Sequence, residues 1–148
     1  MSYTAWFDIP LTCLACSIHV PGRETQLSNS QLLADTPGAR VHAGEVINAE
    51  FDDLEDAYTR CGPLEGNEIH ALEAWICPAC GSIQWARIRY RREPDDHLFL
   101  IDAESILLDE TGLAGIELIT EDALEWTEPG SDRPPAALAA LLERCRGS

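Results

Sequence analysis

Cys77-Pro78-Ala79-Cys80-Gly81 is the stretch that decides the fold, together with Cys13-Leu14-Ala15-Cys16 near the start of the chain. Each Cys-x-x-Cys pair predicts a tight knuckle that directs two sulfur atoms and nearby backbone N–H groups at one point. Pro78 presets a turn dihedral, and Gly81 permits a positive φ just after the second sulfur. Ser17 stands where the first knuckle would carry the corresponding glycine, so we expect the first knuckle to be less regular.

Two such pairs supply four thiolates, which is the ligand set of a tetrahedral structural zinc ion. A thioredoxin-like redox pair is disfavoured, because it needs one Cys-x-x-Cys at a helix N-terminus in a βαβ setting. Iron–sulfur ligation remains the minor alternative. His19 lies three residues beyond Cys16 and is a weak candidate, since four cysteines already fill the tetrahedron. The predicted zinc ligands are Cys13, Cys16, Cys77 and Cys80.

A filled coordination sphere leaves no open position for substrate, so the predicted zinc is structural and not catalytic. Zinc binding to small finger peptides is worth roughly 10–16 kcal/mol. A whole domain is stable by only about 5–15 kcal/mol. Loss of Cys77 or Cys80 is therefore expected to unfold at least the knuckle region.

The length of 148 residues and the apolar fraction of 45% predict one globular domain, residues 1–148. No segment approaches the roughly 18 consecutive apolar residues of a membrane span. The first residues lack the basic start and apolar run of a signal peptide. Cys61 and Cys145 look unpaired and are expected to be small buried hydrophobic side chains. These observations together predict a cytoplasmic protein.

The charge is strongly negative, with 26 acidic residues, 10 basic residues and a formal net charge of −16. Every basic residue is arginine. Such a surface repels nucleic acids and anionic membranes, because binding to either depends on basic side chains. It attracts basic proteins and speeds their encounter. The simpler interpretation is that the acidic surface only keeps the protein soluble.

Hydrophobic patterning predicts an α+β fold, in which an antiparallel β-sheet carries an inserted Cys₄ zinc ribbon and short helices follow at the C-terminal end. The ribbon is formed by residues 6–20 and 70–92, a strand-rich insert spans 22–69, and a hairpin with helices spans 97–146. Expected strands are 5–12, 24–28, 40–49, 67–76, 82–91, 97–108 and 116–119. Expected helices are 50–58, a capped start over Thr120–Trp126, and a last helix after Asp132 with an apolar stripe of Leu138, Leu141, Leu142 and Cys145.

The chain resembles a zinc ribbon over roughly residues 6–92, since a Cys-x-x-Cys pair and a strand-rich insert precede Cys-Pro-x-Cys-Gly and an alternating strand. The resemblance implies the four ligands and no activity, because ribbons serve in transcription, ribosomes, enzymes and small accessory proteins. Ser17 and the long insert depart from the nucleic-acid-binding members.

Arg87, Arg89, Arg91 and Arg92 form the basic cluster of the sequence, and alternation places the first three on one face of a strand. One interpretation is a nucleic-acid contact beside the zinc knuckle. We favour internal pairing with neighbouring acidic residues such as Glu93, Asp95 or Asp96, because the net charge opposes nucleic acid.

Two acidic runs are candidate surfaces for a basic partner. The first lacks the residue order of a calcium loop, and the simpler interpretation of it is a solvated helix face. In the second, Trp126 is a possible aromatic anchor. The candidate residues are Glu45, Glu50, Asp52, Asp53, Glu55 and Asp56 in the first run, and Glu121, Asp122, Glu125 and Trp126 in the second.

No catalytic motif is present, and the four histidines match no catalytic spacing, so we do not expect an enzyme. The leading hypothesis is a zinc-stabilised acidic module that binds and neutralises a basic protein, as an immunity protein or antitoxin does for a bacterial toxin. The alternative is a nucleic-acid-associated ribbon that uses Arg87–Arg92.

Overall fold

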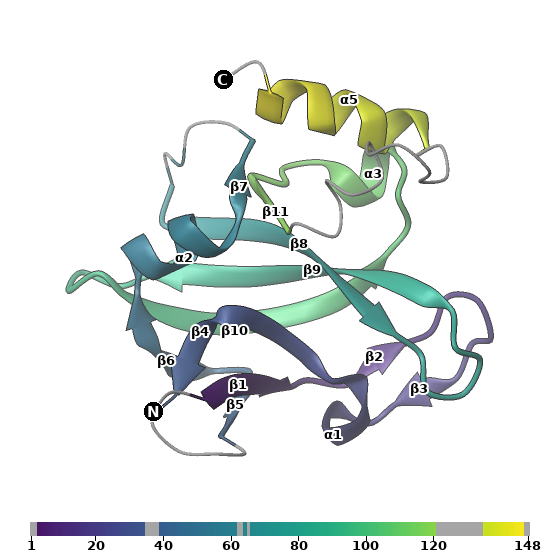
Figure 1. The fold of residues 1–148 in the computed structure, drawn as a ribbon, viewed down its shortest axis with the longest axis horizontal. Helices are drawn as coiled ribbons and strands as arrows, with labels where there is room; N and C mark the ends of the chain where they lie inside the picture. The colour runs from purple at the N-terminus through teal and green to yellow at the C-terminus, as the bar shows by residue number, and fades with distance from the viewer. Residues whose placement is uncertain (1–2, 35–38, 62–63, 65, 121–134, 147–148) are drawn as a thin grey trace.

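A mixed six-stranded β-sheet with short helices forms the centre of the computed structural model, which describes residues 3–34, 39–61, 64, 66–120 and 135–146. The fold is therefore α+β, as the sequence predicts. The strand order of this sheet is β6-β10-β9-β8-β11-β7 (Figure 1). Its strands are β6 (Glu45–Glu50), β7 (Thr59–Arg60), β8 (Glu68–Ile76), β9 (Ile83–Arg92), β10 (His97–Ile106) and β11 (Leu118–Ile119).

Strands β8, β9 and β10 form an antiparallel meander, which confirms the strands expected at 67–76, 82–91 and 97–108. Their alternation gives the sheet two apolar faces. In β9, Ala86, Ile88 and Tyr90 are buried on one face, while Trp85 is buried on the other. The two faces need separate covers, because each apolar face of a sheet must pack against another element.

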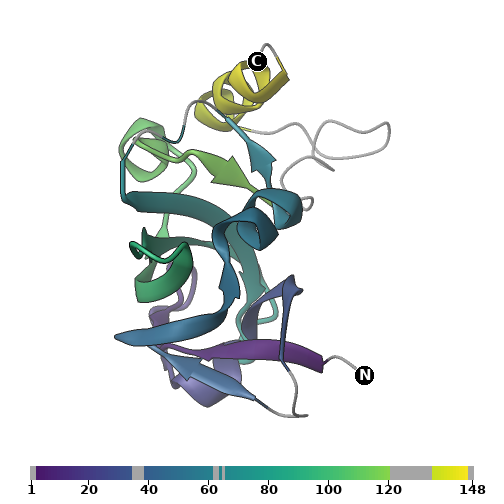
Figure 2. The ribbon, with the colours of Figure 1, turned by 90° about the vertical axis from the view of Figure 1, so that its left-hand side faces the viewer.

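The first face is covered by a second sheet, of order β4-β1-β5, and by helix α2 (Figures 1 and 2). Helix α2 spans Phe51–Ala57 and confirms the helix expected at 50–58. Phe51, Leu54 and Tyr58 face inward from it, as expected, and are at most 7% exposed. The strands of the second sheet are β1 (Tyr3–Asp8), β4 (Leu27–Ala34) and β5 (Arg40–His42).

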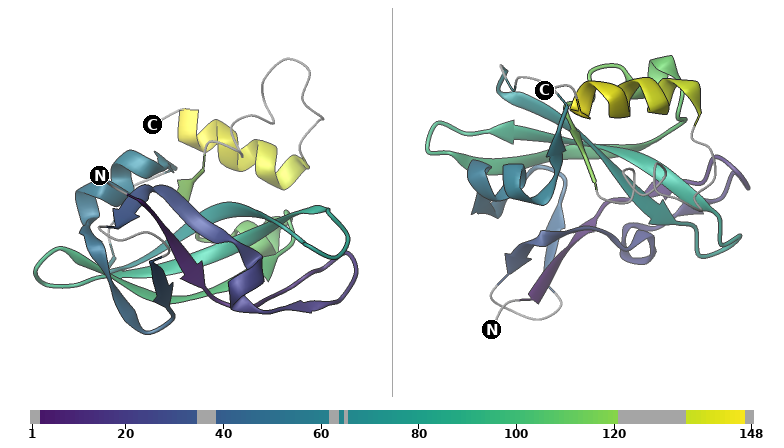
Figure 3. Two further views of the ribbon diagram at one scale, coloured as in Figure 1. Left: turned by 60° about the horizontal axis from the view of Figure 1, so that its bottom comes forward. Right: turned by 45° about the horizontal axis from the view of Figure 1, so that its top comes forward.

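The second face is covered by α3 (Glu110–Leu113) and α5 (Ala136–Arg146), as the views in Figure 3 show. The apolar stripe predicted for the last helix is confirmed. Its members pack against Trp85 and Ile119 of the sheet, so the C-terminal helix docks on the body of the protein. The stripe consists of Leu138, Leu141, Leu142 and Cys145, none more than 7% exposed.

Cys61 and Cys145 are joined in a disulfide, so the expectation that they are unpaired is wrong. They lie 84 residues apart in the sequence, and only the docking of α5 beside the end of β7 brings them together. Each was expected to be a buried small side chain, and the burial itself is confirmed. The bond removes the argument for a reducing compartment that rested on these two residues.

The insert between the knuckles differs from the sequence prediction in its details. Residues 22–25 form the short helix α1 (Gly22–Thr25), and the strand expected at 24–28 begins only at Leu27. The strand expected at 5–12 is divided into β1 and β2 (Leu11–Thr12), and that expected at 40–49 into β5 and β6. Two pairings are parallel, β1 with β5 and β11 with β8, whereas the prediction was an antiparallel sheet.

Some predictions fall outside the described residues. The main one is the helix start over Thr120–Trp126, of which only Thr120 is described. None of the helices in the described part of the chain combines the length and the apolar character needed to cross a membrane.

Candidate metal centre

Two knuckles from distant parts of the sequence lie side by side at one end of the molecule. The first joins β2 to β3 (His19–Val20), and the second joins β8 to β9. In both, the first cysteine's N–H donates to the carbonyl oxygen five residues on, and its carbonyl oxygen accepts from the residue four positions on. Ser17 has a φ of 66° and Gly81 a φ of 71°. The first knuckle is therefore as regular as the second, contrary to expectation, because Ser17 adopts the left-handed conformation itself.

The four cysteine sulfur atoms lie within 4.8 Å of one another. Two contacts cross between the knuckles, Cys13 Sγ to Cys80 Sγ at 3.7 Å and Cys16 Sγ to Cys77 Sγ at 3.8 Å. A tetrahedron with metal–sulfur bonds of about 2.3 Å has edges of roughly 3.8 Å. The sulfur positions thus fit one tetrahedrally coordinated ion. His19 is not part of this group, and its ring contacts the Thr12 hydroxyl.

The surroundings of Cys13, Cys16 and Cys80 shift the pKa values of these three thiols in different directions. The backbone N–H of Cys16 lowers the pKa of Cys13 to about 6, and the Ser82 hydroxyl lowers the pKa of Cys80. For Cys16, the backbone N–H of Ile18 acts in the lowering direction, but the neighbouring sulfur of Cys13 and burial outweigh it and raise the pKa to about 12. Four thiolates this close repel one another, so a cation is needed to hold all of them ionised.

A chain of hydrogen bonds links the two knuckles beside the sulfur cluster. The N–H of Leu14 donates to Gln84 Oε1 at 3.2 Å, and Gln84 Nε2 donates to the Ser82 hydroxyl at 2.9 Å. That hydroxyl lies 2.9 Å from Cys80 Sγ and is left to donate its own proton to the sulfur. Cys80 is the most exposed of the four cysteines, so this chain orients the sulfur that packing restrains least. The sequence prediction missed Ser82 and Gln84, although their positions directly after the knuckle were a usable signal.

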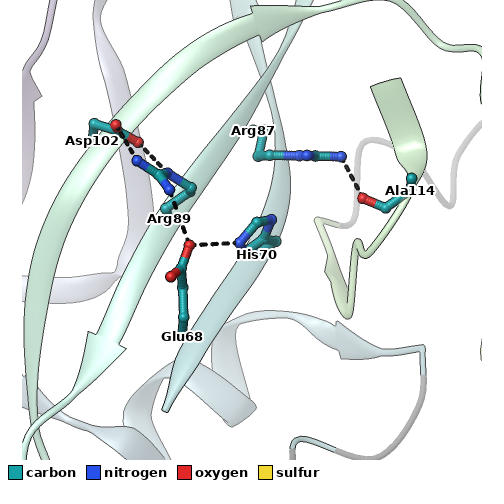
Figure 4. A network of polar contacts seen from close by, with 6 residues as sticks. All are labelled: Glu68, His70, Arg87, Arg89, Asp102 and Ala114. Carbon is teal, nitrogen blue, oxygen red and sulfur yellow. Dashed lines mark hydrogen bonds and ion pairs between the residues drawn. The ribbon is translucent and has the colours of Figure 1, made fainter. Parts of the chain in front are cut away.

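The arginine cluster of β9 is engaged within the chain, as we favoured (Figure 4). Arg89 Nε donates to Asp102 Oδ1 at 2.6 Å, and its Nη1 contacts Glu68 at 3.0 Å. Arg87 donates to the carbonyl oxygen of Ala114, as Figure 4 shows, and to that of Gly112 within α3. These bonds hold β8, β9, β10 and the end of α3 together.

The two remaining arginines of the cluster pair near the β9–β10 turn. Arg91 contacts Glu93, and Arg92 contacts Asp96, which are two of the three acidic partners suggested by the sequence. Both guanidinium groups also lie over aromatic rings, 4.2 Å from the centroid in each case. Asp95, the third suggested partner, pairs with His97 instead.

Half of the first acidic run serves the fold. Glu45 accepts hydrogen bonds from the backbone N–H and the ring of His42, and the backbone bond lowers its pKa. Glu50 and Asp53 form the capping box of α2. Asp52 and Asp56 are exposed, and no hydrogen bond or ion pair is found for either in the part of the chain that the structure describes.

The remaining candidate partner residues are not placed. The side chain of Glu55 lies outside the described residues, and so do Glu121, Asp122, Glu125 and Trp126.

The sequence prediction also missed a buried carboxylate. Glu73 of β8 is 8% exposed, and Tyr58 donates to its Oε2 at 3.0 Å. Tyr90 lies 3.4 Å from the Tyr58 hydroxyl, and burial raises the pKa of Tyr58 well above its usual value. Glu73 alternates with Ile69, Ala71 and Trp75 along β8, and this spacing was the available signal that its side chain faces inward. This group lies in the core between the two sheets, not at the metal centre.

The fold and the site together define an α+β protein with a four-cysteine cluster suited to one metal ion. Comparison with protein-family models, with curated proteins and with solved structures found no match to this chain.

Proposed function

We propose that the four cysteines bind one structural Zn²⁺ ion and that the protein is a zinc-stabilised acidic module that binds a basic protein. The observation that carries the metal assignment is the convergence of four sulfur atoms, from segments about 60 residues apart, at tetrahedral spacing. Sulfur ligands without oxygen or imidazole favour zinc or an iron–sulfur centre over magnesium or calcium. A single ion with all four positions taken by protein has a structural role, and we propose no catalysis at it.

The acidic surface supports the choice of partner. The net charge is −16, and the four arginines of β9 that would contact an anionic partner are already engaged. Asp52 and Asp56, four residues apart on α2, remain available to attract cations. A basic protein whose function depends on a cationic groove would be blocked by such a surface, so an immunity protein or antitoxin is the specific form that we propose.

Nucleic-acid binding through Arg87–Arg92 is not proposed, since no observation favours it. The proposal also makes no use of a cytoplasmic location. The disulfide between Cys61 and Cys145 argues against one, because stable disulfides are rare in a reducing cytosol.

The salt dependence of association tests this function. The zinc-loaded chain is immobilised, basic proteins are captured from a lysate of its source organism, and the association rate of the captured protein is measured at 50 and 500 mM NaCl. Electrostatic attraction predicts at least about a tenfold slower association at the higher salt. Asp52→Lys/Asp56→Lys should slow association at low salt, whereas Thr12→Val should leave it unchanged. An association rate that changes neither with the salt concentration nor in the Asp52→Lys/Asp56→Lys variant would contradict the proposed function.

A further inference from the structure

The two segments that build the metal centre carry no charge. Residues 9–22 and 74–86 contain no Asp, Glu, Arg or Lys, although 24% of the whole chain is charged. His19 and the four cysteines are the titratable side chains in these segments. The structure places the segments next to each other, so the two turns bring no formally charged side chain of their own to this end of a strongly acidic protein.

The same segments expose large apolar side chains. In the described part of the chain six large apolar residues are exposed, and four of them lie here: Leu14, Ile18, Ile76 and Ile83. Ile76 and Ile83 are 60% and 61% exposed and stand opposite each other on β8 and β9. A single exposed apolar residue needs no explanation, but a group of them at one end marks an interaction surface.

This end projects from the body. Figure 1 shows the β2–β3 and β8–β9 turns at one end of the long sheet, with α2 and the β9–β10 turn toward the other end, and Figure 3 shows the same arrangement. Strand β8 alone has 9 residues and is about 30 Å long at 3.3 Å per residue. We call the surface formed by the four exposed apolar residues the knuckle end; it consists of Leu14, Ile18, Ile76 and Ile83. Asp52 and Asp56 on α2 therefore lie far from the knuckle end.

We propose that the knuckle end is the apolar centre of the contact with the basic partner, and that it inserts into an apolar groove bordered by Arg or Lys side chains. The inference rests on the proposed function. The centre of a protein interface is apolar and depleted of charged side chains, as the knuckle end is, and the net charge of −16 attracts a basic partner from a distance. A second copy of this chain fits less well, because it would bring a net charge of −16 toward another −16.

The proposed zinc ion would stabilise this contact indirectly. It fixes the backbone of both turns that carry the four apolar side chains, so the knuckle end is preorganised and little conformational entropy is lost on binding. The acidic residues of α2 and the remaining body supply long-range attraction, and the knuckle end supplies the close contact.

Site-specific photo-crosslinking tests the surface. A benzoylphenylalanine residue replaces Ile76 or Ile83 in the zinc-loaded chain, and the matched control replaces Val46, which is 57% exposed on β6. Each protein is irradiated in a lysate of the source organism, and the cross-linked products are identified. We expect the same basic protein to be linked through Ile76 and Ile83 and not through Val46.

Substitution measures the contribution of the surface. Ile76→Ser/Ile83→Ser should weaken binding of that basic protein at least tenfold, with zinc content unchanged, and Val46→Ser should not weaken it. A basic protein that binds in a salt-dependent manner but is linked only through Val46 would overturn the knuckle-end contact and leave the proposed function standing. A product of twice the chain mass through Ile76 would assign the surface to a second copy instead. If no basic protein binds in a salt-dependent manner, the proposed function falls first.

Discussion

At the residue scale, Ser17 and Gly81 occupy equivalent positions after the second cysteine of each knuckle, and both have a positive φ. For a residue with a Cβ atom, the left-handed conformation is disfavoured by roughly 1–2 kcal/mol, whereas glycine adopts it freely. The sequence showed that Ser17 departs from the pattern. It could not show that Ser17 would adopt the same left-handed conformation as Gly81, because the geometry of the metal centre overrides the preference of serine for a negative φ.

Ser17→Gly is therefore expected to raise the free energy of unfolding of the zinc-loaded protein by about 1 kcal/mol, after allowance for the greater freedom of glycine in the unfolded chain. Denaturant-induced unfolding, monitored by tryptophan fluorescence, measures the change. Gly81→Ser is the reciprocal control and should destabilise by a similar amount. A destabilised Ser17→Gly protein would show that the serine side chain has a role beyond the backbone conformation.

Gln84 and Ser82 are positioning residues for the metal centre. Gln84→Leu breaks the hydrogen bonds to Leu14 and Ser82, and Ser82→Ala removes the bond to the Cys80 sulfur. Groups that hydrogen-bond to metal ligands typically contribute 10–100-fold to metal affinity. We expect zinc to be transferred to a chromophoric chelator at least tenfold faster from either variant.

Thr12→Val is the control, because the Thr12 hydroxyl contacts His19 and no sulfur. Unchanged transfer from Gln84→Leu and Ser82→Ala, or equal acceleration by Thr12→Val, would remove the assigned role.

At the scale of elements, the long strands were predictable and the short ones were not. Strands β8, β9 and β10 are runs of 9 or 10 residues rich in apolar and aromatic side chains, and their bounds agree with the prediction to within about two residues. Segments of two to four residues such as β2, β3 and α1 take their conformation from neighbours that are distant in sequence. Gly22 illustrates this, since a Cβ atom there would lie 2.1 Å from Asp8 Oδ1, and nothing in the local sequence signals the contact.

The Arg89–Asp102 pair joins β9 to β10 and makes stability depend on pH. The hydrogen bonds from Arg89 lower the pKa of Asp102, so the folded state favours the ionised carboxylate. This contribution is present above the unfolded pKa of about 4 and is lost as the pH falls through the lower folded value.

We expect Arg89→Met to destabilise the protein at pH 7 by about 1 kcal/mol, a value reduced because both side chains are partly exposed. The difference between wild type and Arg89→Met should shrink below about pH 4, as measured by urea unfolding at several pH values. Arg87→Met, which removes hydrogen bonds to backbone carbonyl oxygens and leaves Asp102 with its partner, should show no such convergence. A difference that stays constant down to pH 2 would contradict the assigned pairing.

The disulfide joins the last helix to the end of β7, and no sequence signal paired Cys61 with Cys145. Their spacing resembles neither a metal motif nor a short loop, and the docking of α5 that unites them is a tertiary event. A bond that closes a loop of this length stabilises a protein by up to about 4–5 kcal/mol in the chain-entropy account.

Cys61→Ser/Cys145→Ser should lower the free energy of unfolding by about 2–4 kcal/mol and increase amide hydrogen exchange throughout α5. Zinc content should stay the same, because the bond and the metal centre belong to different ends of the fold. Hydrogen exchange in α5 that does not change would mean that the apolar stripe alone holds this helix.

At the scale of the whole molecule, the proposed function gives charge and metal separate roles. Composition predicted an acidic surface and led to the hypothesis of a basic partner, which stays a prediction, and the spacing of the cysteines predicted the four-cysteine cluster. The available acidic side chains could not be predicted, because Glu45, Glu50 and Asp53 are committed to local hydrogen bonds that only the fold reveals. The uncharged knuckle end likewise emerges only when residues 9–22 and 74–86 are brought together.

The central claim is that four thiolates hold one zinc ion that stabilises this fold, and native mass spectrometry of the purified chain tests it most directly. We predict one zinc per chain, with Cys61 and Cys145 oxidised and the other four cysteines protected from alkylation until a chelator is added. Removal of zinc should then unfold at least the region around both knuckles. A chain that carries substantially less than one zinc, or that keeps its zinc after Cys77→Ser, would contradict the account.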